Sequence, residues 1–518
     1  MTVVRRTDGW AALSGLVAVS IAVIAAELTA ALISPSLSPV TAVGSTVIDV
    51  LPPGVKDWAI ETFGTADKLV FLGAMFFIIA GIAAGAGILE YRWRRAGAGV
   101  VLAFGLAGIA AVGVRPQAST AAFAAPVVAL VLGVMLISVL IDRLAAWHPR
   151  LAADGGVPGP VARRRFLVGV GAGGVVAAVS GAAAAGVRNS QSLVTEARER
   201  ITLPRPSAGA NPAAAIPAGA DLGVDGVSPL VTGNDNYYRI DTALVVPVVD
   251  PATWRLRVTG MVDREVELTF DELLAMPLVE RYITLACVSN VVGGDLIGNA
   301  KWLGWPVREL LARAGVQDGA DMVLSRSIDG FTASTPLEAM TDDRDSLIAV
   351  GMNDETLPVE HGFPVRLVVP GLYGFVSATK WVTELKVTRY DDDVAYWSTR
   401  GWSERGPVKT SSRIDVPRNS STVPAGTVAV AGYAWAQHRG IERVEVRVDE
   451  GSWQSARLGT EISRDTWRQF SADLQLDRGS HTVQVRAVDA TGKVQVDRSA
   501  PVTPDGATGL HTVSFTVG

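Results

Sequence analysis

The stretch ITLACVSNVVGGDLIGNAKWLGWPVREL, residues 283–310, decides the fold because it holds the only cysteine of the chain, Cys287. A single thiol cannot close an internal disulfide, so Cys287 is a buried apolar residue, a nucleophile or a metal ligand. Residues 282–286 have the pattern of a strand, and Gly293 and Gly294 break that pattern after the cysteine. A thiol at the end of a strand, before a glycine-containing loop, is expected to face a pocket rather than a core.

The size and composition indicate a membrane region followed by a soluble one. The chain has 518 residues, enough for about three or four domains. Its net charge of -5 gives no basic field, so no nucleic-acid partner is expected. The hydrophobic fraction is 49%, and nearly all of the excess lies before residue 186.

Residues 1–188 are expected to form an all-α transmembrane bundle with five spans. Five apolar runs are long enough, or nearly so, to cross a hydrocarbon core about 30 Å thick: Trp10–Ile33, Lys68–Leu89, Gly97–Val114, Ala121–Ile141 and Phe166–Val187. Arginines gather before the first, third and fifth runs and are scarce in the alternate loops. The positive-inside rule therefore places the N-terminus in the cytoplasm and everything after the fifth span outside.

The stretch around Cys287 resembles the sulfite oxidase family of molybdenum-cofactor enzymes. The residues that carry the resemblance are TLACVSN at 284–290 and AKWLG at 300–304, in that order. In that family the cysteine supplies the one protein thiolate to molybdenum, and the dithiolene of the pterin supplies further sulfur. The resemblance implies that Cys287 is both a metal ligand and a catalytic residue, and that the cofactor is Mo-molybdopterin.

A second segment, HGFPVRLVVPG at 361–371, is similar to the family's cofactor-contacting run. A guanidinium can hold a phosphate through paired hydrogen bonds, and the pterin ends in a phosphate. Lys380-Trp381 matches the family's second cofactor-binding loop. The resemblance therefore implies that His361, Arg366, Thr379 and Lys380 bind the cofactor.

A third segment, NDNYYRID at 234–241, has an aromatic pair followed by a charged residue. In the resembling family such a pair lines the pterin and the metal pocket, which makes Asn236, Tyr237, Tyr238 and Arg239 candidates for cofactor binding. Arg239 is also a candidate catalytic residue that faces the substrate. The alternative is a surface strand with an exposed arginine.

The soluble part is expected to contain two domains behind a linker. Residues 189–230 are rich in Ala, Pro and Gly, which is typical of a linker. Strands and helices mix over residues 231–415 without a βαβ rhythm, which indicates an α+β domain. Residues 416–518 contain short alternating strands, which predict a β-sandwich. That sandwich resembles the family's immunoglobulin-like dimerisation domain, and the resemblance implies a homodimer.

These features predict a membrane-anchored, extracytoplasmic molybdopterin oxidoreductase that performs two-electron oxygen-atom transfer on a small-molecule substrate. The expected location is the cytoplasmic membrane, with lipid around several spans. No Cys-x-x-Cys-His motif occurs, and no haem or Fe–S cluster is expected in this chain. Electrons would therefore pass to a separate carrier protein or a quinone-linked partner. Two alternatives stay open: a sulfoxide-type reductase, and a non-catalytic membrane-anchored binding or scaffold protein.

The segment Arg163-Arg164-Arg165-Phe166-Leu167 precedes a moderately apolar, glycine- and alanine-rich run. It resembles a twin-arginine export signal placed inside the chain. Export in the folded state suits a protein that receives its cofactor in the cytoplasm. The alternative is an ordinary positive-inside boundary of the last span.

The substrate side departs from the family. Sulfite-oxidising relatives use an arginine five residues after the ligand cysteine, and Val292 occupies that position here. The family's pocket tyrosine aligns with Trp402. A valine cannot hydrogen-bond an oxyanion, and an indole donates but is neither an acid nor a base. We therefore expect weak or no sulfite oxidation and a less charged substrate.

Overall fold

The computed structural model describes residues 2–33, 37–51, 67–115, 120–147, 198–206 and 215–518, together with isolated residues between these ranges. Two compact units make up the chain. The first comprises Met1–Thr195 and Ala243–Val248, and the second comprises Glu196–Thr242 and Val249–Gly518.

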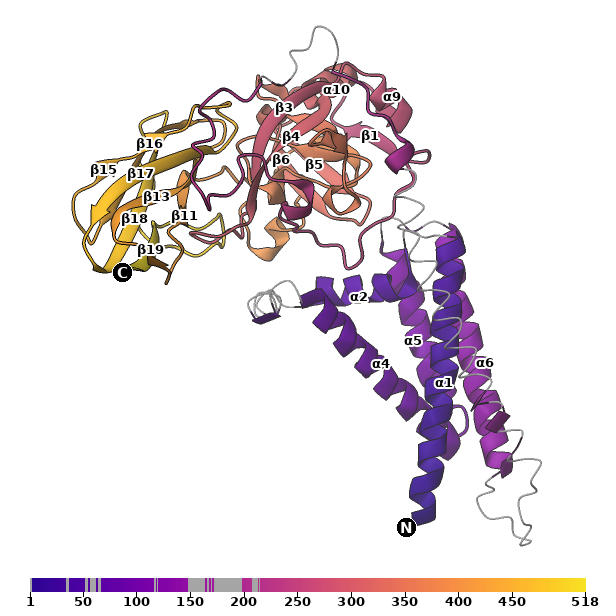
Figure 1. The fold of residues 1–518 in the computed structure, drawn as a ribbon. Helices are drawn as coiled ribbons and strands as arrows, with labels where there is room; N and C mark the ends of the chain where they lie inside the picture. Colours follow the sequence, from indigo (N-terminus) through magenta and orange to yellow (C-terminus); the bar gives the residue numbers. More distant parts are fainter. Residues whose placement is uncertain are drawn as a thin grey trace. The chain divides into compact units, whose positions relative to one another are not determined.

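The first unit is helical. α1 packs against α4 and α6, and α5 packs against α6 (Figure 1). Small residues allow the close approach of α1 and α4, because a Cβ on Gly15 or Gly87 would collide with the opposing backbone. The elements are α1 (Thr2–Ile33), α2 (Pro39–Val50), α4 (Asp67–Arg92), α5 (Ala96–Gly113), η2 (Thr120–Phe123) and α6 (Ala124–Trp147).

Four of these helices are long and apolar enough to cross a membrane: Thr7–Ile33, Val70–Arg92, Ala96–Gly113 and Thr120–Trp147. They correspond to the first four predicted runs, so four candidate spans stand where five were predicted. The fifth, Phe166–Val187, lies almost wholly outside the described residues. α2 was not predicted. Its 12 residues, capped at Ser38 by a capping box with Thr41, are too few to span a bilayer.

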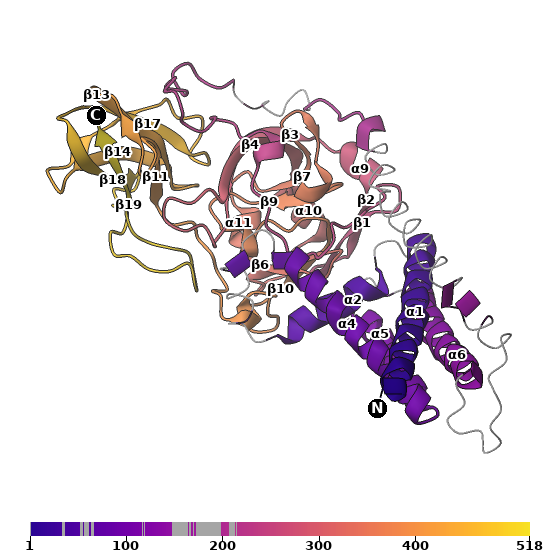
Figure 2. The same cartoon turned by 60° about the horizontal axis from the view of Figure 1, so that its bottom comes forward.

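The α+β domain of the second unit is built on two sheets (Figure 2). The first has the order β2-β1-β10-β5-β6, and the second has the order β3-β4-β7-β8 with β9 paired to β7. All pairs are antiparallel except β1 with β10. The strands are β1 (Arg255–Gly260), β2 (Val266–Thr269), β3 (Val279–Ala286), β4 (Ile297–Pro306), β5 (Met322–Ser327), β6 (Thr332–Pro336), β7 (Leu347–Met352), β8 (Glu355–Thr356), β9 (Arg366–Val368) and β10 (Val382–Thr388).

Short helices join these strands, and their local signals agree with the sequence. Thr269 and Glu272, which have the Thr-x-x-Glu spacing of a capping box, form one at the start of α9. α10 ends at Gly315, whose φ of 72° closes the helix. α10 begins at Val307, because β4 continues through Pro306. The helices are η3 (Asn234–Asn236), α9 (Phe270–Leu274), α10 (Val307–Ala314), α11 (Glu338–Thr341), η4 (Val359–His361), η5 (Gly374–Val376) and η6 (Ser398–Arg400).

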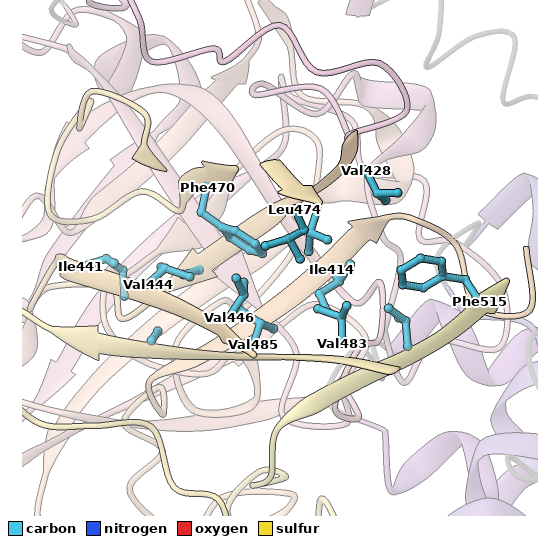
Figure 3. Packing of buried hydrophobic residues seen from close by; sticks show 14 of the residues in the cluster. Ile414, Val428, Ile441, Val444, Val446, Phe470, Leu474, Val483, Val485 and Phe515 are labelled. Atoms are coloured by element: carbon cyan, nitrogen blue, oxygen red, sulfur yellow. The ribbon is translucent and has the colours of Figure 1, made fainter. Parts of the chain in front are cut away.

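The C-terminal domain consists of two facing sheets, which confirms the predicted strands. One has the order β11-β13-β17-β16 and the other β12-β19-β18-β14-β15. Alternate side chains such as Val444, Val446, Val483 and Val485 point into a shared apolar core with Phe470 (Figure 3). The strands are β11 (Ser411–Val416), β12 (Thr422–Val423), β13 (Gly426–Trp435), β14 (Ile441–Val448), β15 (Gln454–Ser455), β16 (Arg457–Leu458), β17 (Arg468–Leu476), β18 (Gly479–Asp489) and β19 (His511–Val517).

The described part of the predicted linker is bonded to both domains of this unit. The Leu222 N–H donates to Gln469 Oε1 at 2.7 Å. The Leu230 carbonyl accepts from Trp467 Nε1 at 2.9 Å and from Asn299 Nδ2 at 3.0 Å. These hydrogen bonds therefore fix the position of the chain just before residues 234–241.

Candidate active site

Cys287 lies directly after β3, where the strand opens into a loop. Its N–H donates to the Leu296 carbonyl at 2.9 Å, which closes the loop onto the start of β4. The Ser289 N–H donates to Cys287 Sγ at 3.4 Å. Burial raises the pKa of the Cys287 thiol, and Ser289 opposes that rise. A buried thiol of this kind becomes a thiolate when a metal cation takes the place of its proton.

The C-terminal domain fixes the strand that leads to Cys287. β3 is an edge strand, and its Thr284 bonds to that domain through three different groups. Thr284 N donates to Asp465 O at 3.0 Å, its carbonyl accepts from Gln437 Nε2 at 3.2 Å, and its hydroxyl accepts from Trp467 N at 2.9 Å. The backbone N–H and carbonyl that Thr284 presents at the sheet edge are therefore hydrogen-bonded, three residues before the thiol.

Tyr237 and Tyr238 form an aromatic wall of the site. Their rings stack at 5.3 Å between centroids, and Tyr237 also meets Trp302 edge to face at 5.9 Å. The Tyr237 hydroxyl donates to the Gly298 carbonyl at 3.0 Å. Burial raises the pKa of both phenols, with Cys287 raising that of Tyr238 and Arg366 lowering it. The Tyr238 phenol therefore lies within the electrostatic reach of both the thiol and the guanidinium.

Arg366 is a buried cation that has no carboxylate partner among the residues the structure describes. The side chain is 5% exposed, and its guanidinium lies 5.0 Å from the centre of the Trp302 ring. It donates only to backbone carbonyls, those of Leu367 at 3.3 Å and His361 at 3.1 Å. Among the described residues, no carboxylate oxygen lies within 4.0 Å of it. Burial lowers the pKa of Arg366, which is the expected cost of an uncompensated buried charge.

His361 lies beside Arg366 and is neutral in this setting. Its Nε2 donates to the Asn234 carbonyl at 3.1 Å, which fixes the tautomer. Burial, followed by the Arg366 charge, lowers the pKa of His361 to about 4. The neutral imidazole therefore offers a hydrogen-bonding edge without adding a second buried charge.

Lys380 supplies a second cation, which the acidic residue Asp241 partly balances. Its Nζ donates to Asp241 Oδ2 at 2.8 Å and to the Glu360 carbonyl at 2.9 Å. Burial lowers the pKa of Lys380 to about 8, although Asp241 opposes this. Thr379, also buried, lies 2.7 Å from the Ser325 hydroxyl.

Arg239 and Asn236 are the most exposed of the predicted site residues. Arg239 Nε lies 3.0 Å from Asp241 Oδ2, and its side chain is 43% exposed. Asn236 is exposed in η3. The ion pair ties Arg239 to the same carboxylate that holds Lys380.

The residues present fit a pterin cofactor that carries phosphate and a metal. A buried guanidinium without a carboxylate is expensive unless an anion binds it, and a phosphate satisfies its planar donors. A buried thiol at a loop mouth suits a soft metal such as molybdenum. The aromatic wall of Tyr237 and Tyr238 adds an apolar surface against which a flat heterocycle can pack.

Around Val292, the Cys287 loop meets Arg413, a buried cation that donates to the Gly294 carbonyl at 3.0 Å and is paired with Asp415 Oδ1 at 2.7 Å. Val292 is half-buried, and Trp402 packs against Phe375 at 5.9 Å and Trp397 at 6.0 Å. Lys409 donates its backbone N–H to the Tyr373 hydroxyl at 3.4 Å. Its Nζ is bonded to Asp505 Oδ1 at 2.8 Å and to the Gly506 carbonyl at 2.6 Å.

Sequence reasoning missed the residues that hold the site in place. Asp241 carries no motif of its own, and Thr284 and Trp467 meet only through the fold, 183 residues apart. Tyr373, a buried phenol whose pKa is raised mainly by burial and partly by Cys287, was also missed. Its position after the Pro370-Gly371 turn was the only available signal.

Comparison with known proteins gives two family matches over these domains. Residues 243–397 match the oxidoreductase molybdopterin binding domain, and residues 407–502 match the Mo-co oxidoreductase dimerisation domain. Among solved structures, the sulfane dehydrogenase SoxCD from Paracoccus pantotrophus is similar with a TM-score of 0.49 and 25% identity, over 56% of this chain and 84% of that one.

Relatives with established names agree on the family. The chain is 31% identical over 308 residues to the mitochondrial sulfite oxidase of Homo sapiens, over 50% of this chain and 56% of that protein, so it spans about half the length of such relatives. It is 30% identical to the sulfite oxidase of Gallus gallus, over 50% of this chain and 67% of that protein. It is 32% identical to an uncharacterized oxidoreductase of Bacillus subtilis, over 34% of this chain and 81% of that protein. The chain belongs to the sulfite oxidase family of molybdopterin-dependent oxidoreductases.

Proposed function

We propose that this chain catalyses two-electron oxygen-atom transfer on a small substrate, with Cys287 as the protein ligand of molybdenum. The observation that carries the proposal is the pairing of a buried thiol with a buried, carboxylate-free guanidinium in one site. Both groups influence the same phenol, because Cys287 raises the pKa of Tyr238 and Arg366 lowers it. A scaffold protein has no reason to keep either group buried at such a cost.

The roles of the residues follow from their contacts. Molybdenum bound to the pterin dithiolene supplies the redox chemistry. Cys287 would hold the metal through its sulfur, supported by the Ser289 N–H. Arg366 and Lys380 would bind the phosphate of the cofactor, and His361 would offer a neutral hydrogen bond beside them. Asn236, Tyr237, Tyr238 and Thr379 complete the cofactor side, and Arg239 sets the charge at its edge.

The second candidate activity is the reduction of a sulfoxide-type substrate. Val292 replaces the arginine that sulfite-oxidising relatives use, and Lys409 is neutralised by Asp505. A charge-assisted hydrogen bond is worth about 1.5–3 kcal/mol, so its loss weakens anion binding by about one to two decades. A neutral oxygen on sulfur does not need that cation.

The four apolar helices support anchoring in the cytoplasmic membrane. On this proposal the catalytic domain lies outside the cytoplasm, and it reaches that side through the twin-arginine motif at residues 163–165. Replacing Arg164 and Arg165 with lysine keeps the positive charge but removes the pair. The C-terminal domain should then be protected from protease on intact spheroplasts, whereas unchanged accessibility would leave only ordinary membrane insertion.

The partners follow from the proposed chemistry. The match to the Mo-co dimerisation domain supports a homodimer through an immunoglobulin-like sandwich. Electrons pass to a separate carrier protein or a quinone-linked partner, since one cysteine cannot hold an Fe–S cluster and the sequence has no Cys-x-x-Cys-His motif for c-type haem. No nucleic acid is involved.

One experiment separates the enzyme from the non-catalytic alternative. The full chain is purified in detergent, its molybdenum and pterin contents are measured, and sulfite and sulfoxides are screened as donors and acceptors of oxygen. We expect near-stoichiometric metal and turnover in at least one direction. A protein that folds with neither metal nor pterin, even when its host makes the cofactor, would be a binding or scaffold protein.

A further inference from the structure

The loop that follows β9 contacts the end of β3, one residue before Cys287. A Cβ on Gly374 would lie 3.8 Å from the carbonyl oxygen of Ala286, the residue before the thiol. The loop is held by two backbone bonds to the start of the next segment, from Tyr373 N to Gly406 O at 2.7 Å and from Val408 N to Gly371 O at 2.9 Å. The position of Tyr373 relative to the thiol is therefore fixed by the backbone.

The phenol of Tyr373 is buried against the C-terminal domain. Its side chain is 6% exposed, and a Cβ on Gly506 would lie 2.7 Å from the hydroxyl oxygen. Gly506 has a φ of 97°, so both its conformation and the approach of the ring require glycine. The Lys409 N–H donates to the hydroxyl oxygen at 3.4 Å. In the part of the chain that the structure describes, no acceptor lies within hydrogen-bond distance of the hydroxyl proton, so this proton is available to a ligand.

The charges around this phenol cancel. Lys409 is bonded to Asp505 and to the Gly506 carbonyl. Burial, followed by the nearby Asp505 and Cys287, raises the pKa of Tyr373 to about 12. The phenol therefore keeps its proton at neutral pH and acts only as a hydroxyl.

Val292 reaches the same C-terminal loop. Its Cγ2 lies 3.5 Å from the position of a Cβ on Gly509, three residues after the glycine that receives Tyr373. The loop of residues 505–509 thus joins the Cys287 loop to the Tyr373 loop. On this side of the thiol, an apolar side chain, a neutral hydroxyl and a neutralised ion pair lie together.

We propose that Tyr373 is a substrate-binding residue that donates a hydrogen bond to an uncharged, polar oxygen, such as that of a sulfoxide, and that residues 505–509 of the C-terminal domain hold it in place. This inference rests on the proposed function. It assigns the pocket hydroxyl to Tyr373 rather than to position 402, where the family pattern places a tyrosine and this chain has Trp402. It also gives the C-terminal domain a part in substrate recognition.

The test compares Tyr373→Phe with Tyr390→Phe in the full-length holoenzyme. Tyr390 donates to the Ser334 carbonyl at 3.3 Å and serves as the matched control. With dimethyl sulfoxide or methionine sulfoxide as substrate and a reduced viologen as electron donor, we expect Tyr373→Phe to lower kcat/KM by about tenfold to hundredfold at unchanged molybdenum content. The control should stay within about twofold. Equal kinetics in the two variants would overturn the inference.

Two further measurements keep the inference testable whatever the substrate. The Mo(V) electron paramagnetic resonance spectrum of chemically reduced protein should shift in Tyr373→Phe and not in Tyr390→Phe. If the loaded wild type turns over no sulfoxide, the proposed direction fails, and this spectrum alone decides the role of Tyr373. If Tyr373→Phe does not load metal, Gly506→Ala decides instead, because it displaces the phenol without removing it. Wild-type spectra and kinetics for that variant would contradict the proposal.

Discussion

The two sides of Cys287 differ in charge. On the cofactor side lie Arg366 and Lys380, both buried cations, and only Lys380 has a carboxylate partner. On the other side lie Val292 and Tyr373, and the cations described near them, Lys409 and Arg413, are paired with Asp505 and Asp415. If the proposed function holds, this difference means that the chain keeps unpaired or partly paired charge for an anionic cofactor and leaves little for an anionic substrate.

The largest effect is expected from a variant that removes the Cys287 sulfur, the atom that lies between the two sides of the site. Cys287→Ser should lower turnover by about a thousandfold or more, because the serine oxygen is a hard ligand and a poor electron donor to molybdenum. Most pterin binding should remain, since Arg366 and Lys380 are untouched. Val291→Ala, an exposed position in the same loop, serves as the control. Wild-type turnover by fully loaded Cys287→Ser would show that Cys287 is not the ligand.

The buried His361 on the cofactor side should make the stability of the folded chain depend on pH. Because the pKa of His361 is about 4 in the folded chain and about 6.5 when unfolded, the unfolded chain binds more protons between these values. The stability of the cofactor-free chain should therefore fall by about 3 kcal/mol as the pH drops from about 6.5 to about 4. His361→Gln should lose this dependence.

His481 provides a control of opposite sign for this measurement. Its pKa is raised by Asp449, so its contribution is present at low pH and is lost as the pH rises. His481→Gln should therefore leave the acid-side loss of stability intact. Thermal unfolding followed by tryptophan fluorescence measures both variants, and an acid-side loss that persists in His361→Gln would contradict a buried neutral imidazole.

Arg366→Met tests the anion-binding side directly. Removing a charge-assisted bond to phosphate should reduce cofactor retention by about tenfold to hundredfold. Arg313→Met is the matched control, because Arg313 also lies over a tryptophan, 4.5 Å from the Trp305 ring, but is exposed. Equal pterin content in the two variants after dialysis would show that Arg366 does not bind the cofactor.

The smallest effect is a gain on the substrate side. Val292→Arg should improve kcat/KM for sulfite by about tenfold, since it adds a cation beside Lys409 and Arg413, which are already paired with Asp505 and Asp415. Val291→Arg adds the same charge at an exposed neighbour and should change little. A wild-type protein with a micromolar KM for sulfite and the turnover of a dedicated sulfite oxidase would refute the comparison itself.

Much of this site could be predicted because its residues occur in short, linear motifs. Cys287, His361, Arg366 and Lys380 each lie beside a strand whose pattern is visible in the sequence, and the structure places His361, Arg366 and Lys380 close together. The strands of the C-terminal domain were equally visible, because alternation along a strand is a local property.

The parts that could not be predicted depend on contacts between distant segments. No local pattern shows that Trp467 bonds to Thr284 or that Tyr373 needs Gly506, because each pair is created by the packing of two domains. Asp241 was missed for the same reason, because its role is to form ion pairs with Lys380 and Arg239. α2 was missed because a 12-residue apolar run is too short to be recognised as a span.

The central claim is that the Cys287 sulfur binds molybdenum, and X-ray absorption at the molybdenum K-edge tests it most directly. Purified wild-type protein and Cys287→Ser, matched for molybdenum and pterin content, are measured side by side. We predict that the variant shows one fewer sulfur neighbour at the metal and one more oxygen or nitrogen neighbour. An unchanged number of sulfur neighbours in Cys287→Ser would contradict the account.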